Sequence, residues 1–167
     1  MVRVSEPEAL ITTARLRLPL ITPAQAADLI GGRRHSSFAP GFPRRDDLDA
    51  CSLVKEVQPW GPRLIVRGVD GLVCGTAGFF GLPAPHDDGV LEVEVGFGLV
   101  PDARGRGVAT EALSALAAAA DAAGVRVRAS VAAENAGSLR VLAQCGFTQL
   151  RGANEDGQLV MVRPVAR

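Results

Sequence analysis

Short alternating runs of apolar and polar residues recur along the chain and predict β-strands. Residues 15–20 alternate leucine with arginine or proline, and residues 126–132 alternate valine or alanine with arginine or serine. A two-residue period is typical of a half-buried strand. Apolar runs at 63–67 and 72–82 flank Asp70-Gly71, and an Asp-Gly pair between two such runs is a strong hairpin signal. The pattern therefore predicts a hairpin within a larger sheet.

The remaining pattern completes the predicted fold. Further strands are expected at 91–99 and on both sides of the turn 154–157. Capping residues, a proline at a helix start and closing glycines predict four helices, at 22–30, 46–57, from Gly105 or Gly107 to about 123, and at 135–144. The predicted class is α/β: a mixed, mostly antiparallel sheet of six to seven strands flanked by helices, forming one domain over residues 1–167. Because a helix connects them, strands 91–99 and 126–132 are expected to run parallel.

Composition narrows the classes of function. Hydrophobic residues make up 47% of the 167 positions, enough for a sizeable core. The 18 basic residues balance the 18 acidic ones, so the protein lacks the positive field that holds nucleic acid, and no nucleic-acid partner is expected. All basic residues except Lys55 are arginines, and the forked guanidinium suits the recognition of anions.

Cysteines and apolar segments indicate the compartment. Cys51, Cys74 and Cys145 are far apart and form no Cys-x-x-Cys pair, so neither a disulfide framework nor a metal site is predicted. The N-terminus lacks the apolar stretch of a signal peptide, and no apolar run approaches the roughly 18 residues of a membrane span. We expect a cytoplasmic protein with no membrane partner, and a homodimer is left open.

The segment from Pro101 to Glu111 has the strongest chemical signal. A hydrophobic strand ends there, and a helix begins among glycines. The first turn of a helix has unpaired N–H groups and a partial positive charge, so it can hold a phosphate group. Gly105 and Gly107 allow close approach of a ligand, although glycine can also serve only the dihedral angles of such a turn. The spacing is neither a P-loop nor a good dinucleotide loop, so a different phosphate-bearing cofactor is indicated.

Two further segments contain candidate residues. Asn135 can cap the helix that begins beside it, with Ser138 three residues further on. In strand 91–99 the alternation places Glu92 and Glu94 on one face, together with Gly96 and Gly98. That face can approach a substrate and accept its proton, or it can simply be a solvated strand face.

Three motifs together resemble the Gcn5-related N-acetyltransferases (GNAT). Arg104-x-x-Gly107-x-Ala109 is similar to the family's Q/R-x-x-G-x-G/A signature, and segments 13–18 and 135–147 resemble the branch that contains ribosomal-protein N-terminal acetyltransferases. The resemblance implies an acyl-CoA N-acyltransferase fold whose two parallel strands splay apart, with acetyl-CoA as co-substrate. It also implies cofactor binding by the backbone of one wall and by Asn135 and Ser138 on the opposite wall; the first set is Leu99, Val100, Arg104, Gly105, Arg106, Gly107, Val108, Ala109 and Thr110.

The same resemblance implies the catalytic chemistry. An ammonium must lose its proton before it attacks a thioester, and Glu94 is the first candidate base, with Glu92 the second. A strand bulge in this family directs an N–H group toward the thioester carbonyl, and the glycines of strand 91–99 would permit one here. The tyrosine that protonates the leaving thiolate in many members is replaced by Leu142, and the chain contains no tyrosine. Water, Ser138 or the tetrahedral intermediate could supply that proton.

The acceptor amine is the least determined part. It could be a small molecule or a peptide N-terminus, selected by a mobile loop within 31–45 and by the turn at 83–89. One alternative is a non-catalytic acyl-CoA-binding or sensing module, and a nucleotide-binding protein is a third reading. His35, the cysteines and the aromatic residues Phe38, Phe42 and Trp60 are expected to have structural rather than catalytic roles.

Overall fold

The computed structural model describes residues 4–166, which form a mixed sheet with helices on both faces. The sheet order is β1-β2-β3-β4-β6-β7-β9-β8, with β5 paired to β6. The strands are β1 (Leu10–Thr12), β2 (Leu16–Pro19), β3 (Pro62–Arg67), β4 (Val73–Phe79), β5 (Ala84–Pro85), β6 (Leu91–Leu99), β7 (Arg126–Val131), β8 (Gln149–Ala153) and β9 (Leu159–Arg163). The predicted fold class is confirmed. Two strands were not predicted, β1 and β5, because two or three residues are too few to show an alternation.

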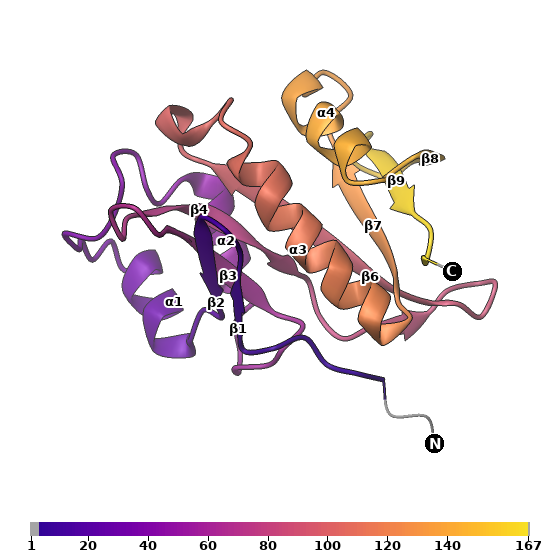
Figure 1. Cartoon of the computed structure of the whole chain (residues 1–167), viewed down its shortest axis with the longest axis horizontal. Coiled ribbons are helices and arrows are strands. Elements are labelled where there is room, and N and C mark those ends of the chain that lie inside the picture. The colour runs from indigo at the N-terminus through magenta and orange to yellow at the C-terminus, as the bar shows by residue number, and fades with distance from the viewer. Residues whose placement is uncertain (1–3, 167) are drawn as a thin grey trace.

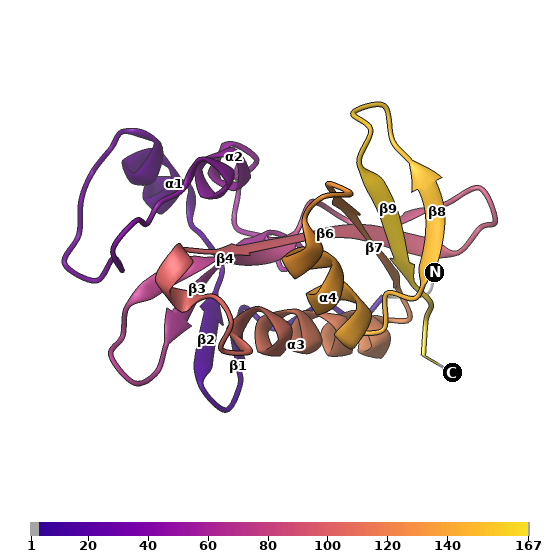
Figure 2. The same ribbon diagram turned by 90° about the horizontal axis from the view of Figure 1, so that it is seen from above.

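The helices lie in two layers. They are α1 (Pro23–Ile30), α2 (Arg45–Ser52), α3 (Val108–Ala123) and α4 (Ala136–Gln144), with a 3₁₀ turn at Pro101–Ala103. Figure 2 shows α1 and α2 on one face of the sheet, and α3 with α4 on the other. Apolar residues of β6 such as Val93 and Val95 join Leu113 and Leu116 of α3 in the buried core. The polar residues Glu92 and Glu94 therefore lie on the opposite face of β6.

Strands β6 and β7 are parallel and pair over only three positions. The pairs are Glu92 with Arg126, Val93 with Val127, and Glu94 with Arg128. Beyond them β6 continues along β4, while β7 follows β9. Figure 1 shows the two strands diverging toward α4 and the start of α3. The predicted parallel, splayed pair is confirmed.

The helix ends show which local signals were reliable. Thr22 caps α1, as predicted, and it also forms a capping box with Gln25. The predicted second helix is too long at 46–57, because α2 ends at Ser52, where the N–H groups of Leu53 and Val54 bond to carbonyls three residues back. Such 3₁₀-type bonds tighten and close a last helical turn.

The predicted mobile loop within 31–45 is irregular but anchored. The N–H of Ala39 donates to the carbonyl of Val73, and the N–H of Val73 donates to the carbonyl of Ser37. Ala39 and Phe42 are buried in the core, and Trp60 is also buried, so the aromatic residues pack as expected. Within residues 4–166, no helix is both long and apolar enough to cross a bilayer.

Candidate active site

The loop before α3 presents a row of free backbone donors. Gly105 and Gly107 have φ values of 74° and 75°, in the left-handed region that favours glycine. Among residues 4–166, no hydrogen bond uses the N–H groups from Gly105 to Thr110. Because these donors surround the positive end of the 16-residue helix α3, the loop can bind an anion through its backbone.

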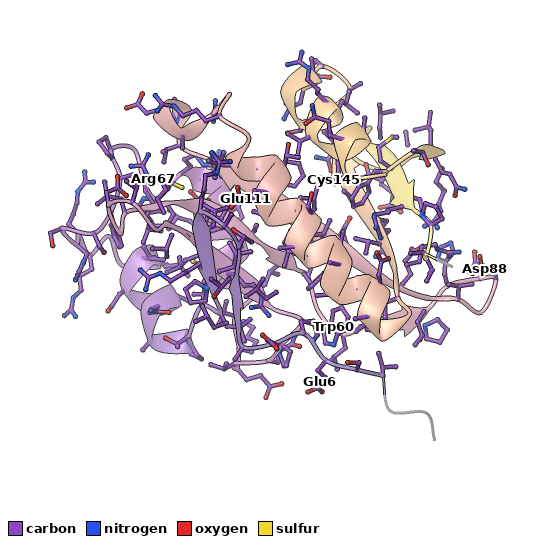
Figure 3. The ribbon with its side chains drawn as sticks, in the orientation of Figure 1. Glu6, Trp60, Arg67, Asp88, Glu111 and Cys145 are labelled. Atoms are coloured by element: carbon purple, nitrogen blue, oxygen red, sulfur yellow. The ribbon has the colours of Figure 1, made fainter. Side chains whose placement is uncertain are left out.

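The turn between β1 and β2 contacts this loop and the first turn of α3. The Arg15 guanidinium donates to the carbonyl of Arg106 at 3.0 Å and to the carboxylate of Glu111 at 2.7 Å. The Arg15 N–H and the Thr13 hydroxyl donate to the other Glu111 oxygen. Burial raises the pKa of Glu111, but these hydrogen bonds outweigh it and lower that pKa. Glu111 lies in the first turns of α3 (Figure 3). The segment 13–18, noted above for its family resemblance, therefore contacts the start of α3 through Thr13 and Arg15, which the sequence did not reveal.

Several predicted cofactor-binding groups already have partners. The Arg104 side chain donates to the carbonyl of Leu99 at 3.0 Å, and the N–H of Val100 donates to the carbonyl of Cys74. The Thr110 hydroxyl donates to Gln144 at the end of α4. These contacts shape the loop, and they leave its free N–H groups as the main donors for a ligand.

A cleft of about 780 Å³ passes between the diverging strands. Its walls include Glu94 and Val95 from the two faces of β6, and Asn135 and Ser138 from the start of α4. The Asn135 side chain accepts from the Ser138 N–H, which confirms the predicted cap. Of the predicted site residues, the cleft brings together Glu94, Asn135 and Ser138, whereas the glycine loop does not line it.

Glu94 sits where the strands separate. Its side chain accepts a hydrogen bond from the Ser130 hydroxyl of β7 at 2.8 Å. Among residues 4–166, this is the one hydrogen bond to the Glu94 carboxylate, so its second oxygen is free. Glu94 also lines a neighbouring cavity of about 300 Å³ with Phe80, His86 and Arg128. The carboxylate can therefore receive a proton in either space.

Glu92, two residues earlier on the same face, is held by three arginines. Its oxygens accept from Arg126 at 2.6 Å, from Arg128 at 2.8 Å and from both terminal nitrogens of Arg151. Its side chain is 1% exposed. Burial raises the pKa of Glu92, but the hydrogen bonds from these arginines more than compensate and bring it to about 2. Such a carboxylate is a poor proton acceptor at neutral pH.

The space beside the two glycines of β6 is filled by side chains and is not open to a ligand. A Cβ atom at Gly96 would overlap the ring of Phe80, and one at Gly98 would overlap the Arg44 guanidinium. The paired stretches of β6 have no register shift, so the predicted bulge is not seen in its described pairs. The alternation therefore holds through Glu92 and Glu94.

The cleft is also lined by residues that the sequence did not single out. Asp46 and Asp49 of α2 line it, as do Asn154, Asp156 and Gln158 of the β8–β9 hairpin. Their sequence signals were only those of a helix start and a turn. Within the predicted acceptor loop 31–45, Arg44 alone lines the cleft, and the turn at 83–89 contributes to the smaller cavity instead.

The other candidates have structural surroundings. His35 bonds to Ser37 in its own loop. The three cysteines are buried, and burial with nearby Asp47 raises the pKa of Cys51 to about 11. Within residues 4–166, no group of three or more potential metal ligands occurs.

A mostly antiparallel sheet that splits between two parallel strands, beside an anion-binding helix start, is the architecture expected of acyl-CoA N-acyltransferases. The chain belongs to the GNAT acetyltransferase family, because residues 15–148 match the model of the acetyltransferase (GNAT) domain. This confirms the family resemblance. No curated protein matches the chain significantly.

Solved structures show the same fold. An acetyltransferase from Agrobacterium tumefaciens strain C58 is similar at 21% identity over 97% of this chain and 98% of that chain, with a TM-score of 0.64. The ribosomal-protein-S5-alanine acetyltransferase from Vibrio fischeri is 16% identical over 95% and 97%, also with 0.64. The microcin C7 self-immunity acetyltransferase MccE, solved with acetyl-CoA and AMP, is 17% identical over 98% and 100%, with 0.62. At these identities the likeness concerns the fold.

Proposed function

We propose that the protein transfers the acetyl group of acetyl-CoA to a primary amine, on a small molecule or a peptide N-terminus, by direct attack. The observation that carries this proposal is the cleft through the split sheet, with the free oxygen of Glu94 in its wall. Family membership and the structure of MccE with acetyl-CoA support the choice of acyl donor.

Each part of the site has a role in this proposal. The N–H groups from Gly105 to Thr110 bind the pyrophosphate, and Arg104 and Arg106 add positive charge beside it. The remaining backbone groups of Leu99 and Val100 extend that wall, and Asn135 with Ser138 forms the opposite one. This division matches the free donors and the lining residues described above.

The chemistry needs one base and one proton source. Glu94 takes a proton from the acceptor ammonium, and the neutral nitrogen forms a bond to the thioester carbonyl carbon. The carbon–sulfur bond then breaks, and the departing thiolate is protonated by Ser138, by water or by the proton released within the intermediate. We assign the base to Glu94 rather than Glu92, because three arginines occupy the Glu92 oxygens.

A thiol-release assay tests the proposal. Purified protein is incubated with acetyl-CoA and a panel of amines, and calorimetry measures its affinity for acetyl-CoA, free CoA and NAD. We expect amine-dependent release of CoA. Binding of acetyl-CoA without turnover of any amine would favour the binding or sensing module, which the absence of tyrosine also favours. Binding of NAD but not of CoA would overturn the proposal.

A further inference from the structure

The cleft between the diverging strands has an excess of negative charge. The charged side chains in its described lining are one cation and four anions, namely Arg44, Asp46, Asp49, Glu94 and Asp156. The whole protein has a net charge of zero, so this excess is local to the cleft. A cleft lined by one sign of charge concentrates ligands of the opposite sign.

The single cation of the lining is already neutralised. The Arg44 guanidinium forms two hydrogen bonds to Asp47, at 2.9 and 3.2 Å, and the Asp47 side chain is 0% exposed. Thr76 donates to the same carboxylate at 2.6 Å. The other terminal nitrogen of Arg44 lies 4.0 Å from the Asp46 carboxylate. In contrast, residues 4–166 provide no ion pair to the carboxylates of Asp49 and Asp156. Their negative charge is therefore available to a ligand.

An exposed aromatic ring lies in the same cleft. Phe80 is 43% exposed, although it is a large apolar residue, and it lines both the cleft and the neighbouring cavity. Its N–H donates to the backbone carbonyl of Glu94, which places the residue directly beside the proposed base. The face of an aromatic ring attracts a cation, so Phe80 and the carboxylates favour the same ligand chemistry.

We infer that the acceptor is an amine that carries at least one further positive charge, such as a diamine or polyamine, or a peptide whose N-terminus is followed by a basic side chain. This inference rests on the proposed function and names its substrate class. Glu94 receives the proton of the reacting nitrogen. The second cation lies against an unpaired carboxylate of the cleft wall, Asp49 on α2 or Asp156 in the β8–β9 hairpin, where a carboxylate-bearing acceptor is repelled.

Three probes of equal chain length test the inference. Cadaverine, pentylamine and 5-aminopentanoate each present a primary amine, and they differ in carrying a cation, a methyl group or an anion at the far end. We expect kcat/KM to be at least tenfold higher for cadaverine than for pentylamine, and lowest for 5-aminopentanoate. The advantage of cadaverine should shrink in 0.5 M salt, because salt screens exposed charges. The tripeptide amides Ala-Arg-Ala and Ala-Gln-Ala test the peptide source in the same way.

Variants locate the effect in the cleft. Asp49→Asn and Asp156→Asn should each lower kcat/KM for cadaverine about three- to tenfold and leave pentylamine nearly unchanged. Asp28→Asn is the matched control, because it removes an exposed carboxylate of α1 that does not line the cleft. An equal loss in the control would show a general charge effect and overturn the inference.

The outcomes separate this inference from the proposed function. Turnover of all three probes with equal kcat/KM would overturn the inference and leave the acetyltransferase function standing. A preference for 5-aminopentanoate would also overturn it. Acetyl-CoA binding without turnover of any probe or peptide would instead count against the proposed function, and the inference would fall with it.

Discussion

The glycine loop and the cleft offer opposite kinds of group to a ligand. The loop offers backbone N–H groups, and its charged partners Arg15 and Glu111 lie beside it. The cleft offers side chains, among them the carboxylates of Asp49 and Asp156. A site made of backbone groups depends on dihedral angles and tolerates few substitutions at its glycines. A site made of side chains can change its ligand preference when one residue is substituted. This difference suits the proposed function, in which acetyl-CoA is the common acyl donor of the family and the acceptor amine varies between members.

The largest effect is expected at Glu94, in the wall of the cleft. Glu94→Gln should lower the acetylation rate by roughly 10²–10⁴, the usual contribution of a general base. The loss should shrink at high pH, where free amine needs no base. Calorimetry with acetyl-CoA is the control, since its affinity should not change. Full activity of this variant at neutral pH, with activity lost in Glu92→Gln, would transfer the role to Glu92.

Glu92 should instead matter for stability. Glu92→Gln leaves Arg126, Arg128 and Arg151 without their shared anion, and we expect it to lower the free energy of unfolding by about 2–3 kcal/mol in urea titrations. Because the pKa of Glu92 is depressed to about 2, its stabilisation is present above its ordinary pKa near 4.5 and is lost as the pH falls toward 2. The deficit of the variant should therefore shrink across that range.

Asp87→Asn is the control for that experiment, because Asp87 is exposed in the turn beside this cluster and should leave the stability unchanged. A Glu92→Gln protein as stable as the wild type at pH 7 would contradict a structural role for the arginine cluster.

The backbone site should be sensitive to a Cβ atom at one glycine. Gly107→Val forces a β-branched residue into a φ of 75° and should weaken acetyl-CoA binding more than tenfold, above about 1.4 kcal/mol. Gly124→Val is a matched control, since Gly124 has a φ of 70° at the other end of the same helix. It should cost stability without changing the affinity. Unchanged affinity in a folded Gly107→Val protein would refute the role of the loop.

The smallest effect is expected at Arg15, which contacts the loop. Arg15→Gln removes the contacts to Arg106 and Glu111 and should weaken acetyl-CoA binding about three- to tenfold, the equivalent of one ordinary hydrogen bond. Arg17→Gln, at an exposed position of β2 two residues further along the chain, should leave the calorimetric affinity unchanged. Equal affinities for both variants would show that the loop keeps its shape without Arg15.

Much of the fold follows from local signals in the sequence. The Asp70-Gly71 turn, the Thr22 cap and the Asn135 cap are contacts between near neighbours, so the residues that make them lie together in the chain. The same is true of the loop at Gly105 and Gly107, whose free N–H groups result from local dihedral angles and a helix start. Strands of two or three residues were missed because they depend on partners elsewhere.

The alternating pattern of β6 does not distinguish Glu92 from Glu94, and only the tertiary structure shows how their surroundings differ. Glu92 and Glu94 occupy the same strand face, but Arg151, 59 residues away, helps to fix one as an ion-paired anchor, while the other keeps a free oxygen. The cleft is likewise lined both by Asp49 on α2 and by Asp156 in a hairpin far away in the sequence. The sequence by itself determined most of the elements and the conformation of the glycine loop, because those depend on neighbouring residues. Only folding determined which glutamate keeps a free oxygen and which charges line the cleft, because these depend on which distant side chains share a space.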